Sequence, residues 1–120
     1  MSYKTKIETM RGELRVMRKI IPEAMRGFGE MEKAITENGV MDKRQKEWIA
    51  LAMGIAQRCE PCIGFHIGAM MRAGGTREEL ADICAVAIQM GGGPAMMYAA
   101  HALACWDELA AEQAGTPTTA

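Results

Sequence analysis

Apolar residues recur every three or four positions along much of the 120-residue chain, which is the spacing of one face of an α-helix. Residues 3–20 form the first such stripe, made of Ile7, Met10, Leu14, Met17 and Ile21. Pro22 suits the first turn of a second helix, and Asn38–Gly39 supplies its C-terminal stop. This second helix is predicted to turn one side inward, with Met25, Phe28, Met31, Ala34 and Ile35.

Asp42 is a capping residue for a third helix, which is predicted to run to about Arg58. Its segment WIALAMGIA is apolar on all sides, which predicts a buried helix or a subunit interface. A fourth helix is expected to begin near Cys59, with Pro61 in its first turn, and to end at AGG, residues 73–75.

Thr76 and Glu79 match the capping box S/T-x-x-E and so predict the start of a fifth helix. Its inner face is expected to hold Leu80, Ile83, Cys84, Ala87 and Ile88. The stretch GGGP at 91–94 predicts a break, after which Pro94 begins a sixth helix that runs to about Glu112. This stretch lacks the Lys-Ser/Thr pair and the preceding strand of a phosphate-binding loop.

No pattern of period two indicates a strand, so the expected fold is all-α. We predict a single domain of five to six helices over residues 1–113, followed by a disordered tail at 114–120. An apolar third helix and twelve methionines in a chain of this length leave more apolar surface than one monomer easily covers. We therefore expect a homo-oligomer.

The formal net charge of −1 gives no basic excess that would favour nucleic acid or an anionic membrane surface as a partner. The N-terminal sequence MSYKTKIETM lacks the apolar segment of a signal peptide, and the apolar run at 48–56 is too short to cross a bilayer. A cytoplasmic location is expected. Cysteines stay reduced in that compartment, and disulfides there tend to be transient and catalytic.

The stretch RCEPCIGFH, residues 58–66, carries the chemistry of the chain. On a helix, Cys59 and Cys62 are three residues apart and share a face, and His66 lies one turn beyond Cys62 on that face. Backbone N–H groups and the dipole at the helix start favour a thiolate at Cys62. The spacing therefore suits a nucleophilic thiol with a resolving partner, and His66 can accept or relay a proton.

Two other interpretations of the same residues remain open. Cys59, Cys62 and His66 are three soft ligands, whereas a structural zinc site takes four. Cys84, His101 or Cys105 would have to supply the fourth, but each fits a helical core stripe. A packed helix with inert thiols is the remaining interpretation, and neither cofactor nor metal is expected.

Glu47 stands at the head of the apolar stripe that continues with Leu51 and Ile55. If it faces inward, an antiparallel fourth helix would bring it near the cysteines, where it could take the thiol proton directly or through water. The alternative is that Glu47 closes the charged run DKRQKE in solvent and pairs with Lys43. Periodicity alone does not decide between these placements.

Together, Glu47, Cys59, Cys62 and His66 give the pattern E-x11-C-x2-C-x3-H. This pattern resembles the signature of the alkylhydroperoxidase D-like (AhpD-like) branch of the carboxymuconolactone decarboxylase family. The flanking text KEWIALAMGIAQRCEPCIGFHIGAMMRAGGTREEL and AVAIQMGGGPAMMYAAHAL is also similar, so that the resemblance covers roughly residues 20–110.

The resemblance implies an all-helical fold that assembles into trimers or hexamers, and an oxidoreductase that uses a peroxide as acceptor. It implies Cys62 as the peroxidatic thiol, Cys59 as the resolving thiol, and Glu47 with His66 as a proton relay. The implied partners are a hydroperoxide substrate and a dithiol or protein reductant. Pro61 occupies a place where the well-studied relatives have a histidine.

Two functions are alternatives to the peroxidase. The decarboxylase branch converts a lactone without depending on a CxxC pair, and that activity rests on the resemblance alone. A non-catalytic zinc or interaction module is the other alternative.

Overall fold

The computed structural model describes residues 2–115, and all regular secondary structure in that range is helical. Five helices follow one another, namely α1 (Tyr3–Ile20), α2 (Pro22–Glu37), α3 (Lys43–Ala56), α4 (Glu60–Arg72) and α5 (Arg77–Gln113). The predicted all-α fold of five to six helices is confirmed. Of the predicted tail, residues 114 and 115 form a turn, and residues 116–120 lie outside the described residues.

The helix starts are set by the predicted capping residues. The Thr76 hydroxyl accepts from the N–H of Glu79 at 3.2 Å, and the Glu79 carboxylate accepts from the N–H of Thr76 at 2.8 Å. Asp42 and Gln45 form a second capping box of the same kind at the start of α3. Gly39 and Gly74 follow α2 and α4 with φ of 98° and 84°, a conformation that favours glycine and stops a helix.

The predicted break at residues 91–94 is a kink inside α5 and not a separate loop. Gly92 has φ 73° and ψ −153°, which interrupts the helical backbone, and the chain continues as helix through Pro94. The two helical segments predicted for this region are therefore present, joined without a connecting loop.

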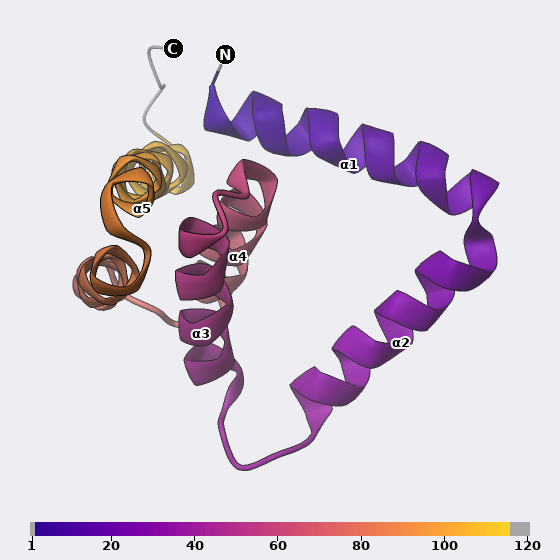
Figure 1. The fold of residues 1–120 in the computed structure, drawn as a ribbon. Coiled ribbons are helices and arrows are strands. Elements are labelled where there is room, and N and C mark those ends of the chain that lie inside the picture. Colours follow the sequence, from indigo (N-terminus) through magenta and orange to yellow (C-terminus); the bar gives the residue numbers. More distant parts are fainter. Residues whose placement is uncertain (1, 116–120) are drawn as a thin grey trace.

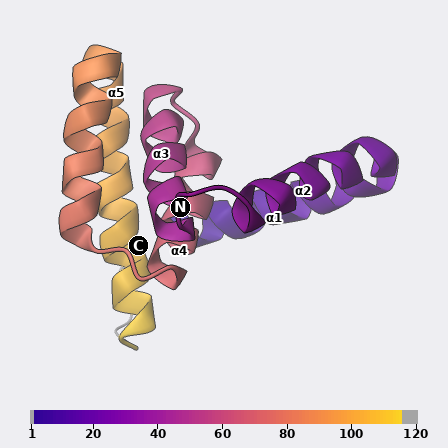
Figure 2. The same ribbon diagram turned by 90° about the horizontal axis from the view of Figure 1, so that it is seen from below.

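The core lies where α3, α4 and both segments of α5 pack together, as Figures 1 and 2 show. Its largest fully buried side chains come from these three helices: Leu51, Ile55, Ile63, Ile67, Met70, Leu80 and Cys105. The predicted inner face of the fifth helix is confirmed at Leu80, Ile83, Cys84 and Ala87.

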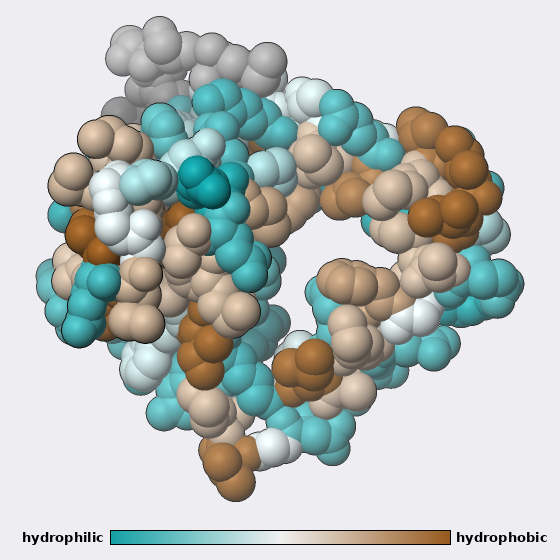
Figure 3. All heavy atoms as spheres, in the orientation of Figure 1, coloured by the Kyte–Doolittle hydropathy of each residue, from teal (hydrophilic) through white to brown (hydrophobic). Residues whose placement is uncertain are grey.

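Helices α1 and α2 form an arm that extends from this body (Figures 1 and 2). The first turns of α1 pack on α4, but Ile7, at 8% exposure, is the one buried residue of α1, and α2 has none. Phe28, Met31 and Ile35 are 56%, 50% and 55% exposed, so the predicted inward stripe of the second helix is wrong for the single chain. Figure 3 shows an open space between arm and body, bordered in part by hydrophobic side chains.

Among residues 2–115, α5 is the one helix that is long and apolar enough to cross a membrane. Its uncharged stretch at residues 83–106 is much longer than the apolar run at 48–56, on which the expectation of no membrane segment rested. Core helices of soluble proteins meet the same criterion. The kink at Gly92 interrupts α5, which contributes nine buried residues to the core, while 28% of its most apolar 18-residue window is buried in the single chain.

Candidate functional site

The two cysteines lie at the first turn of α4 and are joined by a disulfide bond, with 5.2 Å between their Cα atoms. Cys59 is the N-cap residue, and its Sγ accepts a hydrogen bond from the backbone N–H of Cys62 at 3.3 Å. The sequence predicted that helix-terminal N–H groups would favour an anion at Cys62. The structure shows one of these N–H groups directed at the sulfur of Cys59 instead.

A tight connection brings α3 directly into this turn. Arg58 has φ 59°, a left-handed conformation that is uncommon for a residue with a side chain. The N–H of Cys59 then donates to the carbonyl of Gly54 at 3.0 Å, which ties the first cysteine to the last turns of α3.

Gly54 is a part of the site that sequence reasoning missed. A Cβ at this position would stand 3.4 Å from Cys62 Cβ, so the glycine lets the α3 backbone lie against the second cysteine. In the sequence, Gly54 belongs to the stretch GIA, which indicates only an apolar helical segment. A single sequence carries no signal of the contact with Cys62.

Glu47 faces inward and contacts His66, which settles the alternative that the sequence left open. Its Oε2 lies 2.7 Å from His66 Nδ1, and 15% of the Glu47 side chain is exposed. Because a carboxylate only accepts, the hydrogen in this bond belongs to Nδ1, and Nε2 is left to exchange a proton. The pairing with Lys43 is not seen.

His66 lies four residues after Cys62 in α4, so one helical turn separates them on the same face. Its side chain is 37% exposed, which leaves the imidazole in contact with solvent as well as with Glu47. The structure therefore brings Cys59 and Cys62 together in one bond, and Glu47 and His66 together in another, with α4 joining the two pairs.

A cavity of about 290 Å³ opens beside the Glu47–His66 pair, between the arm and the body. On α2 the lining residues are the apolar Phe28, Met31 and Ile35 together with Glu32 and Thr36. The ammonium of Lys46 donates to the carbonyls of Ile35 and Asn38, and so holds the end of α2 close to α3.

The other two cysteines are buried free thiols, as their helical stripes predicted. Burial raises the pKa of Cys84, and burial together with the nearby Glu108 and Glu60 raises the pKa of Cys105 to about 12. Both thiols are therefore protonated near neutral pH and poor nucleophiles.

His101 and Tyr98 lie together on α5 in edge-to-face contact, with 5.5 Å between ring centroids. The His101 ring also contacts the hydroxyl of Tyr3, with 2.9 Å from Oη to Nδ1. The contact of His101 with Tyr3 joins α5 to α1, and neither His101 nor Tyr98 lines the cavity beside Glu47 and His66. Within residues 2–115, no group of three or more His, Cys, Asp or Glu side chains is arranged as a metal-binding set.

The first turns of α1 also pack on the start of α4. A Cβ on Gly64 would stand 2.6 Å from Ile7 Cγ1, which shows how closely α1 lies on α4. The ammonium of Lys6 lies 2.8 Å from the carboxylate of Glu60, the residue that follows Cys59. Fifty-four residues separate Lys6 from Glu60 in the sequence.

Comparison with known proteins gives consistent matches. The family model of the carboxymuconolactone decarboxylase family matches residues 22–104. The crystal structure of the apo form of a carboxymuconolactone decarboxylase family protein from Legionella pneumophila superposes with a TM-score of 0.84 at 40% identity, covering 88% of this chain and 95% of that one.

Two curated relatives are uncharacterized proteins. One, from Cupriavidus necator, is 38% identical over 106 residues, which are 88% of this chain and 94% of the relative. The other is encoded in the cox locus of Paracoccus denitrificans and is 35% identical over 82 residues, covering 68% of this chain and 74% of the relative.

Proposed function

The chain belongs to the carboxymuconolactone decarboxylase family, and on that premise we propose that it is a thiol-dependent peroxidase that uses Cys59 and Cys62 as its redox pair. The observation that carries the proposal is that two contacts lie one helical turn apart on α4. The cysteines are within bonding distance at a helix start, and one turn away His66 is hydrogen-bonded to Glu47.

The oxidative half of the reaction begins when His66 takes the proton of the Cys62 thiol and leaves a thiolate. Its sulfur attacks an oxygen of the hydroperoxide, so that an S–O bond forms, the O–O bond breaks, and the electron pair leaves on the alkoxide. His66 protonates this alkoxide to an alcohol, and Glu47 stabilises the proton on the imidazole before transfer. Cys62 is then a sulfenic acid.

Resolution follows within the same helical turn. The Cys59 sulfur attacks the Cys62 sulfur, the S–S bond forms, and the S–O bond breaks to release water. In total, one hydroperoxide and two thiols give one alcohol, one water and one disulfide. The contact between the two cysteines supports this step because neither residue has to leave the first turn of α4.

A dithiol donor must then reduce the disulfide by exchange. The N–H of Cys62 that donates to Cys59 Sγ stabilises negative charge on that sulfur, so Cys59 is the better leaving thiolate. The donor therefore attacks Cys62 and forms a transient mixed disulfide with it. The donor's second thiol releases both cysteines and is itself oxidised.

We also propose that the protein is cytoplasmic and assembles into trimers or hexamers. The exposed apolar face of α2 supports assembly, because side chains such as Phe28 would be covered by another copy.

The family description favours lactone decarboxylation as a second candidate. That reaction does not need the dithiol, so a variant in which both Cys59 and Cys62 are serine separates the two functions. If wild type and this variant both turn over carboxymuconolactone, and neither consumes hydroperoxide, the lyase replaces the peroxidase.

The peroxidase proposal is tested by hydroperoxide consumption with dithiothreitol as the dithiol donor. We expect wild type to turn over an alkyl hydroperoxide, and the Cys59→Ser and Cys62→Ser variants to lose turnover. Zinc analysis of the same sample tests the remaining alternative. One zinc per chain, with both cysteines protected from alkylation and no peroxide consumption, would overturn the proposal.

A further inference from the structure

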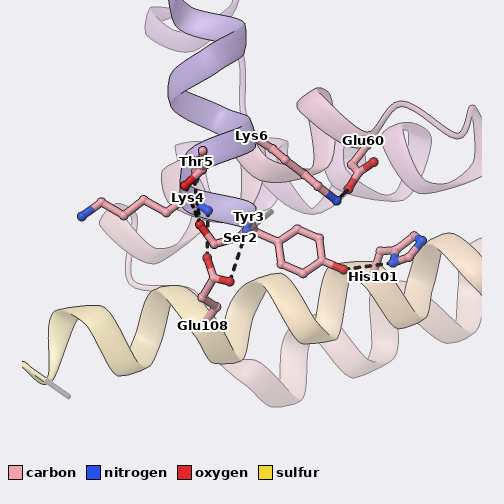
Figure 4. Close-up of polar contacts among 8 residues, drawn as sticks. All are labelled: Ser2, Tyr3, Lys4, Thr5, Lys6, Glu60, His101 and Glu108. Atoms are coloured by element: carbon pink, nitrogen blue, oxygen red, sulfur yellow. Dashed lines mark hydrogen bonds and ion pairs between the residues drawn. The ribbon is translucent and has the colours of Figure 1, made fainter. Parts of the chain in front are cut away.

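The N-terminal helix α1 contacts the first turn of α4, which carries the Cys59–Cys62 pair. Figure 4 shows Lys6 of α1 extending to Glu60, with 2.8 Å between Nζ and Oε1. The start of α1 is itself fixed to α5, because the Glu108 carboxylate accepts from the N–H groups of Tyr3 at 3.2 Å and Lys4 at 2.8 Å. Lys6 is thus presented to the turn by an anchored helix end.

Glu60 stands at the N-terminus of α4, where the helix dipole favours a carboxylate, but its negative charge opposes ionisation of the neighbouring thiols. It is the first residue of α4 and stands between the two cysteines, in the same helical turn that must hold a thiolate. A negative charge near a thiol opposes ionisation, and an opposite charge near it favours ionisation. An unpaired Glu60 would therefore work against the helix terminus, which stabilises the anion.

We propose that Lys6 is a positioning residue for the dithiol: its ammonium neutralises Glu60, so that the thiolate of the Cys59–Cys62 pair forms without an unpaired negative charge beside it. This inference rests on the proposed function in one respect, namely that the pair is redox-active. Lys6 lies in α1, outside the matched family segment at residues 22–104.

The surrounding charges are consistent with this role. Hydrogen bonding to Glu60 raises the pKa of Lys6, so the side chain stays an ammonium across the range in which thiols ionise. The Tyr3 ring lies 4.9 Å from the ammonium, measured to its centroid, and Glu108 approaches from α5. On the α3 side, Glu47 is paired with His66.

A pair of variants separates an electrostatic role from a structural one. Lys6→Gln leaves Glu60 unpaired and should raise the pKa of the first thiol to ionise by about 0.3 to 1 unit, since the pair is partly exposed and screened. Glu60→Gln leaves Lys6 unpaired and should lower the same pKa by a similar amount. If the contact only clamps α1 to α4, both variants break the same clamp and move the pKa in one direction.

The measurement uses the full-length reduced protein. Thiolate absorbance in the ultraviolet and the rate of iodoacetamide reaction are followed against pH, with the alkylated residue identified by mass spectrometry. Lys6→Arg keeps the charge and should retain the wild-type pKa. Lys4→Gln is the matched control. It removes a positive charge from the same helix, but this charge pairs with Glu112 and not with Glu60.

Opposite shifts in Lys6→Gln and Glu60→Gln, with wild-type values in the two controls, would support the inference. Shifts in the same direction, or no shift in Glu60→Gln, would overturn it. If Lys6→Gln does not fold, the direction of the pKa shift in Glu60→Gln decides whether the inference holds. No peroxide is used, so a protein that shows these shifts but consumes no peroxide contradicts the proposed function and leaves the role of Lys6 standing.

Discussion

The carboxylate of Glu47 on α3 and the imidazole of His66 on α4 form a hydrogen bond with 2.7 Å between Oε2 and Nδ1. The bond fixes which ring nitrogen carries the hydrogen and leaves the other to exchange protons with a substrate. It also couples the residue one turn from Cys62 to a carboxylate that is mostly removed from solvent.

Glu47→Gln should slow the oxidation of the dithiol by an alkyl hydroperoxide by about 10²-fold, the scale at which a positioned proton relay acts. The amide cannot stabilise a protonated imidazole, while the shape of the side chain is kept. Stopped-flow measurement of thiol loss in the reduced protein checks this. Glu13→Gln, on the exposed face of α1, is the matched control, and a Glu47→Gln rate equal to that of the control would exclude Glu47 from the relay.

Gly64→Ala should destabilise the protein by about 1 to 3 kcal/mol, because the added Cβ would stand 2.6 Å from Ile7 Cγ1 and force α1 away from α4. Denaturant unfolding measures the change. Gly29→Ala in α2 has no atom within 4 Å of the new Cβ and should leave stability unchanged or slightly higher. An Ile7→Ala change in the Gly64→Ala background should recover part of the loss. Equal stability of the two alanine variants would show that α1 does not lie on α4 as described.

Cys105 should make the folded protein less stable at alkaline pH. Its pKa is raised to about 12 in the folded chain, so the unfolded chain loses this proton first as pH rises. The stabilising contribution is complete below about pH 9 and is lost progressively toward about pH 12. Between neutral pH and about pH 10.5, the loss of unfolding free energy due to Cys105 should amount to about 2 kcal/mol.

The measurement for Cys105 is the free energy of unfolding against pH in wild type and in Cys105→Ala. The alanine variant should start from a lower stability, because a buried thiol is lost, and should fall less steeply with pH. Parallel curves for the two proteins would contradict the buried, protonated state of Cys105.

The exposed face of α2 should be covered in solution by another copy of the chain. Light scattering at micromolar concentration should give a trimer or hexamer for wild type. Phe28→Asp together with Met31→Asp should reduce the assembly size, since both side chains are at least half exposed in the single chain. Glu30→Lys, on the same helix, should not. A monomeric wild type would contradict the expected assembly.

Much of the fold could be predicted because its signals are local. Capping residues such as Asp42 and Thr76, and turn glycines such as Gly39, act within a few residues of themselves, and the structure uses each as predicted. The kink at Gly92 was also visible in the sequence. Whether it would be a loop or a bend was not, because that depends on how the two halves of α5 pack.

The features that could not be predicted depend on what each helix packs against. The stripe of α2 has the spacing of a buried face, and periodicity cannot tell the core of one chain from the surface between two chains. Glu47 could not be placed because one rotation of α3 sends it to solvent and another sends it to His66. The contact of Gly54 with Cys62 depends on how α3 packs on α4, and the contact of Lys6 with Glu60 joins segments 54 residues apart, so no local pattern predicts either.

The central claim is that Cys62 reacts with hydroperoxide, and trapping its sulfenic acid tests this most directly. Reduced Cys59→Ser protein is exposed to one equivalent of an alkyl hydroperoxide with dimedone present, and the adduct is located by mass spectrometry. We predict an adduct on Cys62 alone, with the buried thiols of Cys84 and Cys105 unmodified in the same molecule. No adduct on Cys62, or equal modification of Cys84 and Cys105, would contradict the account.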